Sequence, residues 1–69
     1  MSIDPKKAIL YIQGNAVRYK QGGTDGSIKR FNSNPKTASF QGKDIIVHLE
    51  NGKIIRVIGP SFSNEEPVR

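Results

Sequence analysis

The sequence predicts an all-β fold, a small antiparallel barrel-like domain of about five to six short strands. Two-residue turn sequences separate apolar runs at hairpin spacing, and apolar residues alternate with polar ones between residues 37 and 58. Isoleucine also outnumbers leucine by nine to two. β-Branched side chains suit a pleated surface better than a helix. Closing the strands into a barrel would cover the edges and the apolar face that an open sheet leaves exposed.

Residues 8–20 admit two interpretations. As a hairpin, they turn at Gly14-Asn15, a glycine-first pair that suits a type II′ turn. As a helix over residues 5–20 with Asp4 as its N-cap, they would pack on a C-terminal meander in an α+β fold. The helix would hold Gly14 in its interior at a cost of about 1 kcal/mol relative to alanine. The hairpin uses this glycine, so we favour it. Its paired positions are Gln13 with Ala16, Ile12 with Val17, and Leu10 with Tyr19.

The next segments are predicted to be short and irregular. Residues 21–26 (QGGTDG) contain three glycines and are interpreted as a flexible loop. This loop lacks the Gly-Lys-Ser/Thr ending of a phosphate-binding P-loop, so we expect a simple strand connection. Residues 27–31 form a short strand, and residues 32–36 (NSNPK) form a turn cluster.

Residues 37–58 are predicted to form a three-stranded meander. Gly42-Lys43 makes its first tight turn, which places Phe40 opposite Ile45. Since side chains alternate between the two faces of a strand, this turn decides which residues face the core.

Asn51-Gly52 is interpreted as the second turn, a two-residue type I′ turn that places Leu49 opposite Ile54. The two turns then agree on one inner face, with Arg56 as its single charged exception. The inner face consists of Ala38, Phe40, Ile45, Val47, Leu49, Ile54 and Ile58.

We expect one domain at residues 1–60 and a polar C-terminal tail at residues 61–69. The chain has 69 residues and no cysteine, so it can build one thin core without a disulfide. The predicted core consists of Leu10, Ile12, Val17, Phe40, Ile45, Val47, Leu49 and Ile54.

The charge distribution predicts a polyanionic partner, with single-stranded nucleic acid first. The formal net charge is +5, and six cations between residues 17 and 43 are opposed by Asp25 alone. Small β-domains that bind single strands combine a cationic groove with aromatic side chains on which bases stack. The predicted contact residues are Tyr11, Arg18, Lys20, Lys29, Arg30 and Phe31.

A second hypothesis is a protein-interaction or oligomerisation module, with a homodimer as its simplest form. In the predicted register, Ile46, Ile55 and Val57 are neighbours on the outer face of the meander, beside His48. A sheet face in contact with water does not need three such apolar residues, so a partner would cover them.

Composition argues against an enzyme, a cofactor or a metal site. There is one histidine, no cysteine, and the acidic residues are scattered apart from one adjacent pair. No segment reaches the eighteen or so apolar residues of a membrane span, and the apolar run at residues 8–12 is short for a signal peptide. We therefore expect a cytoplasmic protein with no membrane association.

Overall fold

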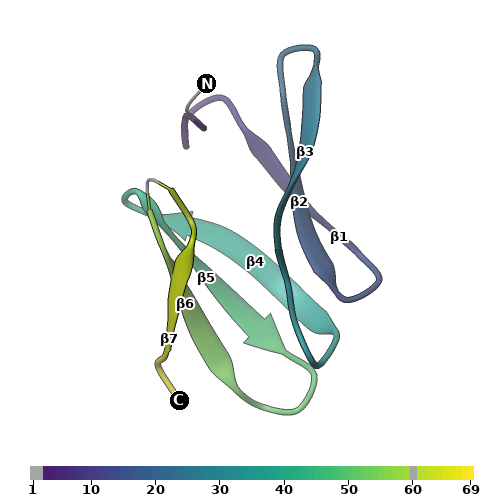
Figure 1. Cartoon of the computed structure of the whole chain (residues 1–69), viewed down its shortest axis with the longest axis vertical. Helices are drawn as coiled ribbons and strands as arrows, with labels where there is room; N and C mark the ends of the chain where they lie inside the picture. The colour runs from purple at the N-terminus through teal and green to yellow at the C-terminus, as the bar shows by residue number, and fades with distance from the viewer. Residues whose placement is uncertain (1–2, 60) are drawn as a thin grey trace.

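The computed structural model describes residues 3–59 and 61–69, which form two antiparallel sheets (Figure 1). The all-β prediction is confirmed. The described residues contain no helix, so the α+β alternative is wrong. Backbone hydrogen bonds pair the described strands within each sheet but not across the two sheets, so these strands do not close into a barrel. The first sheet holds β1 (Ile9–Gln13), β2 (Ala16–Gln21) and β3 (Thr24–Arg30), and the second holds β4 (Pro35–Gln41), β5 (Asp44–Leu49), β6 (Ile54–Ile58) and β7 (Asn64–Pro67).

Three hairpins turn on a two-residue sequence that begins with glycine. The first residues of these turns, Gly14, Gly22 and Gly42, have φ values of +63°, +60° and +63°. A type II′ turn needs a positive φ at its first central position, which glycine adopts without steric cost. The pairing predicted around Gly14-Asn15 and Gly42-Lys43 is confirmed, because every predicted pair there is observed.

The glycine-rich segment at residues 21–26 is a hairpin and not the flexible loop that we expected. Gln21 pairs with Thr24, so only Gly22 and Gly23 lie outside the ladder. β2 and β3 are each longer than predicted as a result, and Asp25 is a strand residue. The ring of Tyr19 packs over Gly26, its direct partner, where a Cβ atom would lie 2.7 Å from the ring.

The register predicted for β5 and β6 is wrong by one residue. The Leu49 N–H donates to the Lys53 carbonyl oxygen at 2.9 Å, so the loop has three residues, Glu50, Asn51 and Gly52. Of these three, only Gly52 has a positive φ, at +90°. A type I′ turn would need a positive φ at both Asn51 and Gly52. The chain instead makes a turn over residues 49–52, in which the Gly52 N–H donates to the Leu49 carbonyl oxygen at 3.1 Å. Gly52, the last residue of this turn, adopts the positive φ.

This shift exchanges the two faces of β6. Ile55 and Val57 are buried in the core, whereas Ile54 and Ile58 are half-buried on the other side of the strand. Arg56 leaves the inner face, on which it was the charged exception, and pairs with residues of the outer face. A one-residue slip reverses every side chain of a strand, which accounts for all of these differences.

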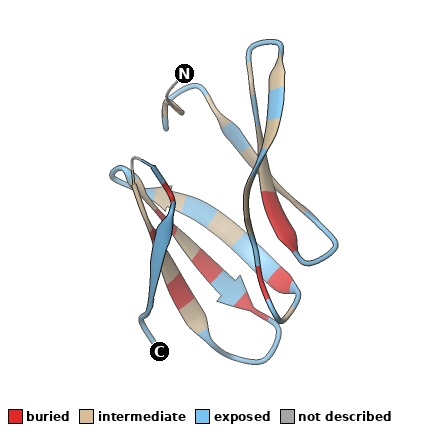
Figure 2. Ribbon diagram, viewed as in Figure 1, coloured by how far each residue is buried: buried red, intermediate tan, exposed pale blue. Residues whose placement is uncertain are grey.

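The core lies between the sheets and takes residues from both (Figure 2). Leu10 and Phe40 are partly buried against it, whereas Phe31 and Phe62, which were absent from the predicted core, are among its members. The buried cluster consists of Val17, Phe31, Ile45, Val47, Leu49, Ile55, Val57 and Phe62. Four of the eight predicted core residues are therefore in this cluster: Val17, Ile45, Val47 and Leu49.

The C-terminal segment is not the polar tail that we expected, because part of it forms a strand. All four residues of β7 are exposed and three of them are polar, yet they pair with β6 from Ile58–Asn64 to Ile55–Pro67. Just before β7, Phe62 is buried with a φ of +58°. This backbone region is costly for a bulky side chain, and burial of the aromatic ring offsets that cost. The segment thus completes the second sheet.

Candidate functional site

The outer face of the first sheet carries four of the six predicted contact residues. Tyr11 of β1 pairs directly with Arg18 of β2, and Lys20 lies two residues further along the same face. Arg30 of β3 pairs with Ala16, whose side chain points to the same face as Arg18. We call Tyr11, Arg18, Lys20 and Arg30 the outer cationic face.

Hydrogen bonds hold the centre of this face in one arrangement. The Tyr11 hydroxyl donates to Asp25 Oδ1 at 2.6 Å, and Arg18 Nε donates to the Tyr11 hydroxyl at 3.0 Å. An Arg18 terminal nitrogen also lies 3.3 Å from Asp25 Oδ1. These two contacts to the Tyr11 hydroxyl fix the orientation of its ring on the outer cationic face.

Lys20 and Arg30 extend the positive charge to either side of this cluster. The Lys20 ammonium lies 5.8 Å from the centroid of the Tyr11 ring, within cation–π range. Lys20 and Arg30 are exposed, and neither forms an ion pair with a carboxylate of the described residues. The face therefore combines one oriented aromatic ring with three cations and one carboxylate.

The same contacts shift the ionisation of the charged groups at the centre. The pKa of the Asp25 carboxyl is lowered, first by the hydrogen bond from Tyr11 and further by the hydrogen bond and charge of Arg18. The pKa of Arg18 is raised, again first by its hydrogen bond with Tyr11. A lowered carboxyl pKa stabilises the fold fully above the unfolded-state pKa of about 3.9 and loses that effect as the pH falls through the folded-state pKa.

Replacing Tyr11 by phenylalanine should raise the pKa of the Asp25 carboxyl toward its ordinary value, because the strongest contact that lowers it is removed. A pH titration of the side-chain carboxyl carbon by NMR would measure this. Tyr19→Phe is the matched control, since Tyr19 lies on the opposite face of β2 and its loss of a hydroxyl should leave Asp25 unchanged. Equal Asp25 titration in both variants would contradict the network.

The other two predicted contact residues lie on the core side of β3 and of the chain that follows it. The Lys29 ammonium is 3.4 Å from Glu65 Oε1, so it joins the first sheet to β7. Phe31 is 5% exposed and packs in the core. Phe31 therefore does not present its ring on the outer cationic face as a stacking platform, contrary to the prediction.

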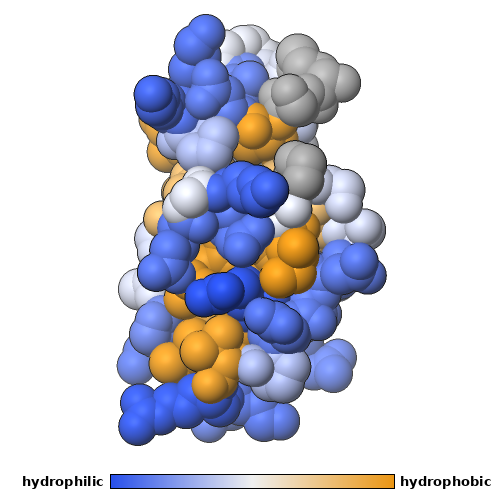
Figure 3. Space-filling view, turned by 90° about the vertical axis from the view of Figure 1, so that its left-hand side faces the viewer, coloured by the Kyte–Doolittle hydropathy of each residue, from blue (hydrophilic) through white to orange (hydrophobic). Residues whose placement is uncertain are grey.

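The apolar partner face that we expected is not assembled. Ile55 and Val57 are in the core, 8% and 0% exposed, because of the corrected register of β6. Ile46 is half-buried and His48 is exposed, both on the other face of the second sheet. On the side of the molecule drawn in Figure 3, hydrophilic side chains divide the apolar surface into separate areas.

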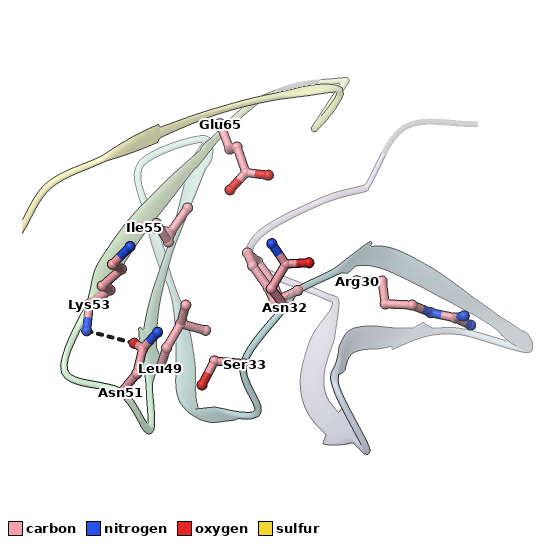
Figure 4. Close-up of a pocket in the computed structure, with 9 residues that line it drawn as sticks. Arg30, Asn32, Ser33, Leu49, Asn51, Lys53, Ile55 and Glu65 are labelled. Atoms are coloured by element: carbon pink, nitrogen blue, oxygen red, sulfur yellow. Dashed lines mark hydrogen bonds between the residues drawn. The ribbon is translucent and has the colours of Figure 1, made fainter.

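A pocket of about 210 Å³ lies where the end of β3 meets the second sheet (Figure 4). The segment that joins β3 to β4 lines it with Phe31, Asn32 and Ser33, and the opposite wall comes from β5, β6 and the loop between them. The pocket was not predicted from the sequence, although the two turn clusters that border it, residues 32–36 and Asn51-Gly52, were. Only the packing of one sheet against the other brings these clusters together.

The described residues contain no group of three or more His, Asp or Glu side chains that could hold a metal ion. Within residues 3–59 and 61–69, the structure has no helix of the length and apolar character needed to span a membrane. The comparisons with known proteins give no relative: no protein family matches the chain, and neither a curated protein nor a solved structure gives a significant match.

Proposed function

We propose that this protein is a binding module without catalytic activity and that it binds single-stranded nucleic acid along the outer cationic face. The observation that carries the proposal is the register of the first sheet, which gathers one aromatic ring and three cations on one side. Phosphates would contact Lys20, Arg18 and Arg30, and a base would stack on Tyr11. A stacked base contributes about 1–3 kcal/mol in such complexes.

The arrangement of Tyr11 supports this role. Asp25 and Arg18 hold its hydroxyl, so the ring is oriented before a ligand arrives and loses little freedom on binding. Asp25 has the opposite electrostatic effect, since its negative charge lies beside the cations that would contact phosphate. Replacing it by asparagine should therefore strengthen binding at low salt.

The protein-interaction alternative is weaker, because it depended on a continuous apolar face. Two of its four residues, Ile55 and Val57, are in the core. We therefore place the nucleic-acid proposal first.

Replacing Lys20 and Arg30 together by alanine should weaken binding to a short single-stranded oligonucleotide and make it less sensitive to salt. Each lost phosphate contact should flatten the slope of log affinity against log salt by about 0.7. Fluorescence anisotropy between about 50 and 200 mM salt would measure the slope. Both side chains are exposed, so the fold should be unchanged in circular dichroism.

The double variant Lys36→Ala, Lys43→Ala is the matched control, because it removes the same charge from exposed positions associated with the second sheet. It should retain most of the wild-type slope. Equal losses in the two double variants would show that net charge alone attracts the oligonucleotide. Absence of any binding below about 100 μM at low salt, near the weak end of non-specific affinities, would refute the proposal.

A further inference from the structure

We infer that the pocket between the sheets receives one base of the bound strand, an inference that rests on the proposed function. In the proposed function, the outer cationic face holds phosphates and stacks a base on Tyr11. The pocket supplies a second, recessed position on the other side of the first sheet, near the end of β3. Its walls combine buried apolar side chains with amide groups, as a flat heteroaromatic ring with polar edges requires.

The apolar part of the pocket suits the faces of a base. Phe31, Leu49 and Ile55 belong to the buried core and also line the pocket, so an aromatic ring and two aliphatic side chains meet the ligand. Aromatic and apolar side chains commonly enclose bases that proteins turn out of a stack. Phe31 would thus contact a base inside the pocket, on the opposite side of the sheet from Tyr11.

The polar part of the pocket suits the edges of a base. Asn32 and Asn51 carry carboxamides, which both donate and accept hydrogen bonds as base edges do. Asn51 Oδ1 already accepts from the Lys53 N–H at 3.0 Å, so its amide nitrogen is the group left to donate. Asn32 points into the pocket toward Glu65 in Figure 4. These groups offer complementary partners on two sides of the pocket.

Charge at the pocket also fits a nucleotide. Lys53 lines it from the loop side, and the single carboxylate in the lining, Glu65, is paired with Lys29 at 3.4 Å. This ion pair reduces the repulsion that a phosphate would otherwise meet. A cation beside a pocket with apolar walls therefore matches an anionic backbone attached to an apolar ring.

The size and position of the pocket favour a single base as its occupant. The volume of about 210 Å³ is below the 300–1,000 Å³ or so of pockets that take drug-sized molecules. Arg30 belongs to both sites: it lines the pocket, while its guanidinium points away from it in Figure 4. A bound strand would therefore pass Arg30 at the end of β3 to place a later base in the pocket.

Replacing Asn32 by alanine should weaken binding of a short single-stranded oligonucleotide by about three- to tenfold, the loss expected for a hydrogen bond. The salt slope should stay as in the wild type, because no phosphate contact is removed. Ser33→Tyr, which would fill the pocket, should weaken binding at least as much. Fluorescence anisotropy measures both, and circular dichroism verifies the fold.

Asn34→Ala is the matched control, since Asn34 is exposed and outside the pocket lining, and its backbone carbonyl contact with the Glu50 N–H is kept. An abasic oligonucleotide of equal length should bind the wild type and the Asn32 variant equally. Salt-dependent binding with no difference between the Asn32 and Asn34 variants overturns the pocket inference and leaves the proposed function standing. If the wild-type protein binds no oligonucleotide, both the pocket inference and the proposed function are overturned.

Discussion

Replacing Ile45 by alanine should lower the free energy of unfolding by about 2–5 kcal/mol, the range for deleting a large aliphatic side chain from a core. Ile45 is 0% exposed and lies on β5, which pairs with a strand on each side. A chain of 69 residues is expected to have a total stability of about 3–10 kcal/mol. The variant should therefore be partly or wholly unfolded, as urea denaturation followed by circular dichroism would show.

Ile46→Ala is the control for this prediction, because it makes the same change one residue further on. Ile46 points to the other face of β5 and is half-buried. Its truncation therefore removes less buried apolar surface and leaves no cavity in the core. Its loss of stability should be clearly smaller. The reverse order would mean that the faces of β5 are assigned the wrong way round.

Replacing Gly59 by alanine should destabilise the protein by about 1–3 kcal/mol or more, the cost of forcing extra atoms into a packed site. A Cβ atom on Gly59 would overlap the backbone carbonyl of Lys43, which cannot rotate away as a side chain could. The Gly59 N–H also donates to Asp44 Oδ1 at 2.8 Å, which holds the two segments together. Thermal denaturation should show a lower midpoint.

Gly23→Ala is the corresponding control. A Cβ at Gly23 would meet no atom within 4 Å, and its φ lies outside the left-handed region. This variant should be as stable as the wild type or slightly more stable, because alanine restricts the unfolded chain. Similar losses at both positions would show that the contact between Gly59 and Lys43 does not limit stability.

The sequence predicted the parts of the fold that depend on local backbone chemistry. Gly14 and Gly42 each occupy a turn position whose positive φ only glycine adopts easily. The strand pairing around both turns was predicted correctly. Asn51-Gly52 fits two kinds of loop, and the local sequence favours the wrong one. Arg56 was the signal that could have decided between them, since the two-residue turn placed this charge in the core.

The site was predictable to the same extent and for the same reason. The outer cationic face follows from the register of one hairpin, so Tyr11, Arg18 and Lys20 were placed together correctly. The partners of the cations were not predicted, because Asp25 was assigned to a loop and Glu65 to a tail. The pocket depends on how the sheets pack, which no local pattern in the sequence reports.

The topology also bears on how fast the chain can fold. Among residues 3–59 and 61–69, every ladder joins strands that are adjacent in the sequence, and no ladder links β3 to β4. Closing the short loops between these paired strands, of two to five residues, costs less entropy than closing long loops between distant strands. Each sheet can therefore form its hydrogen bonds from its own half of the chain. Only the docking of the two sheets requires a search between distant segments, and that step creates the shared core and the pocket together.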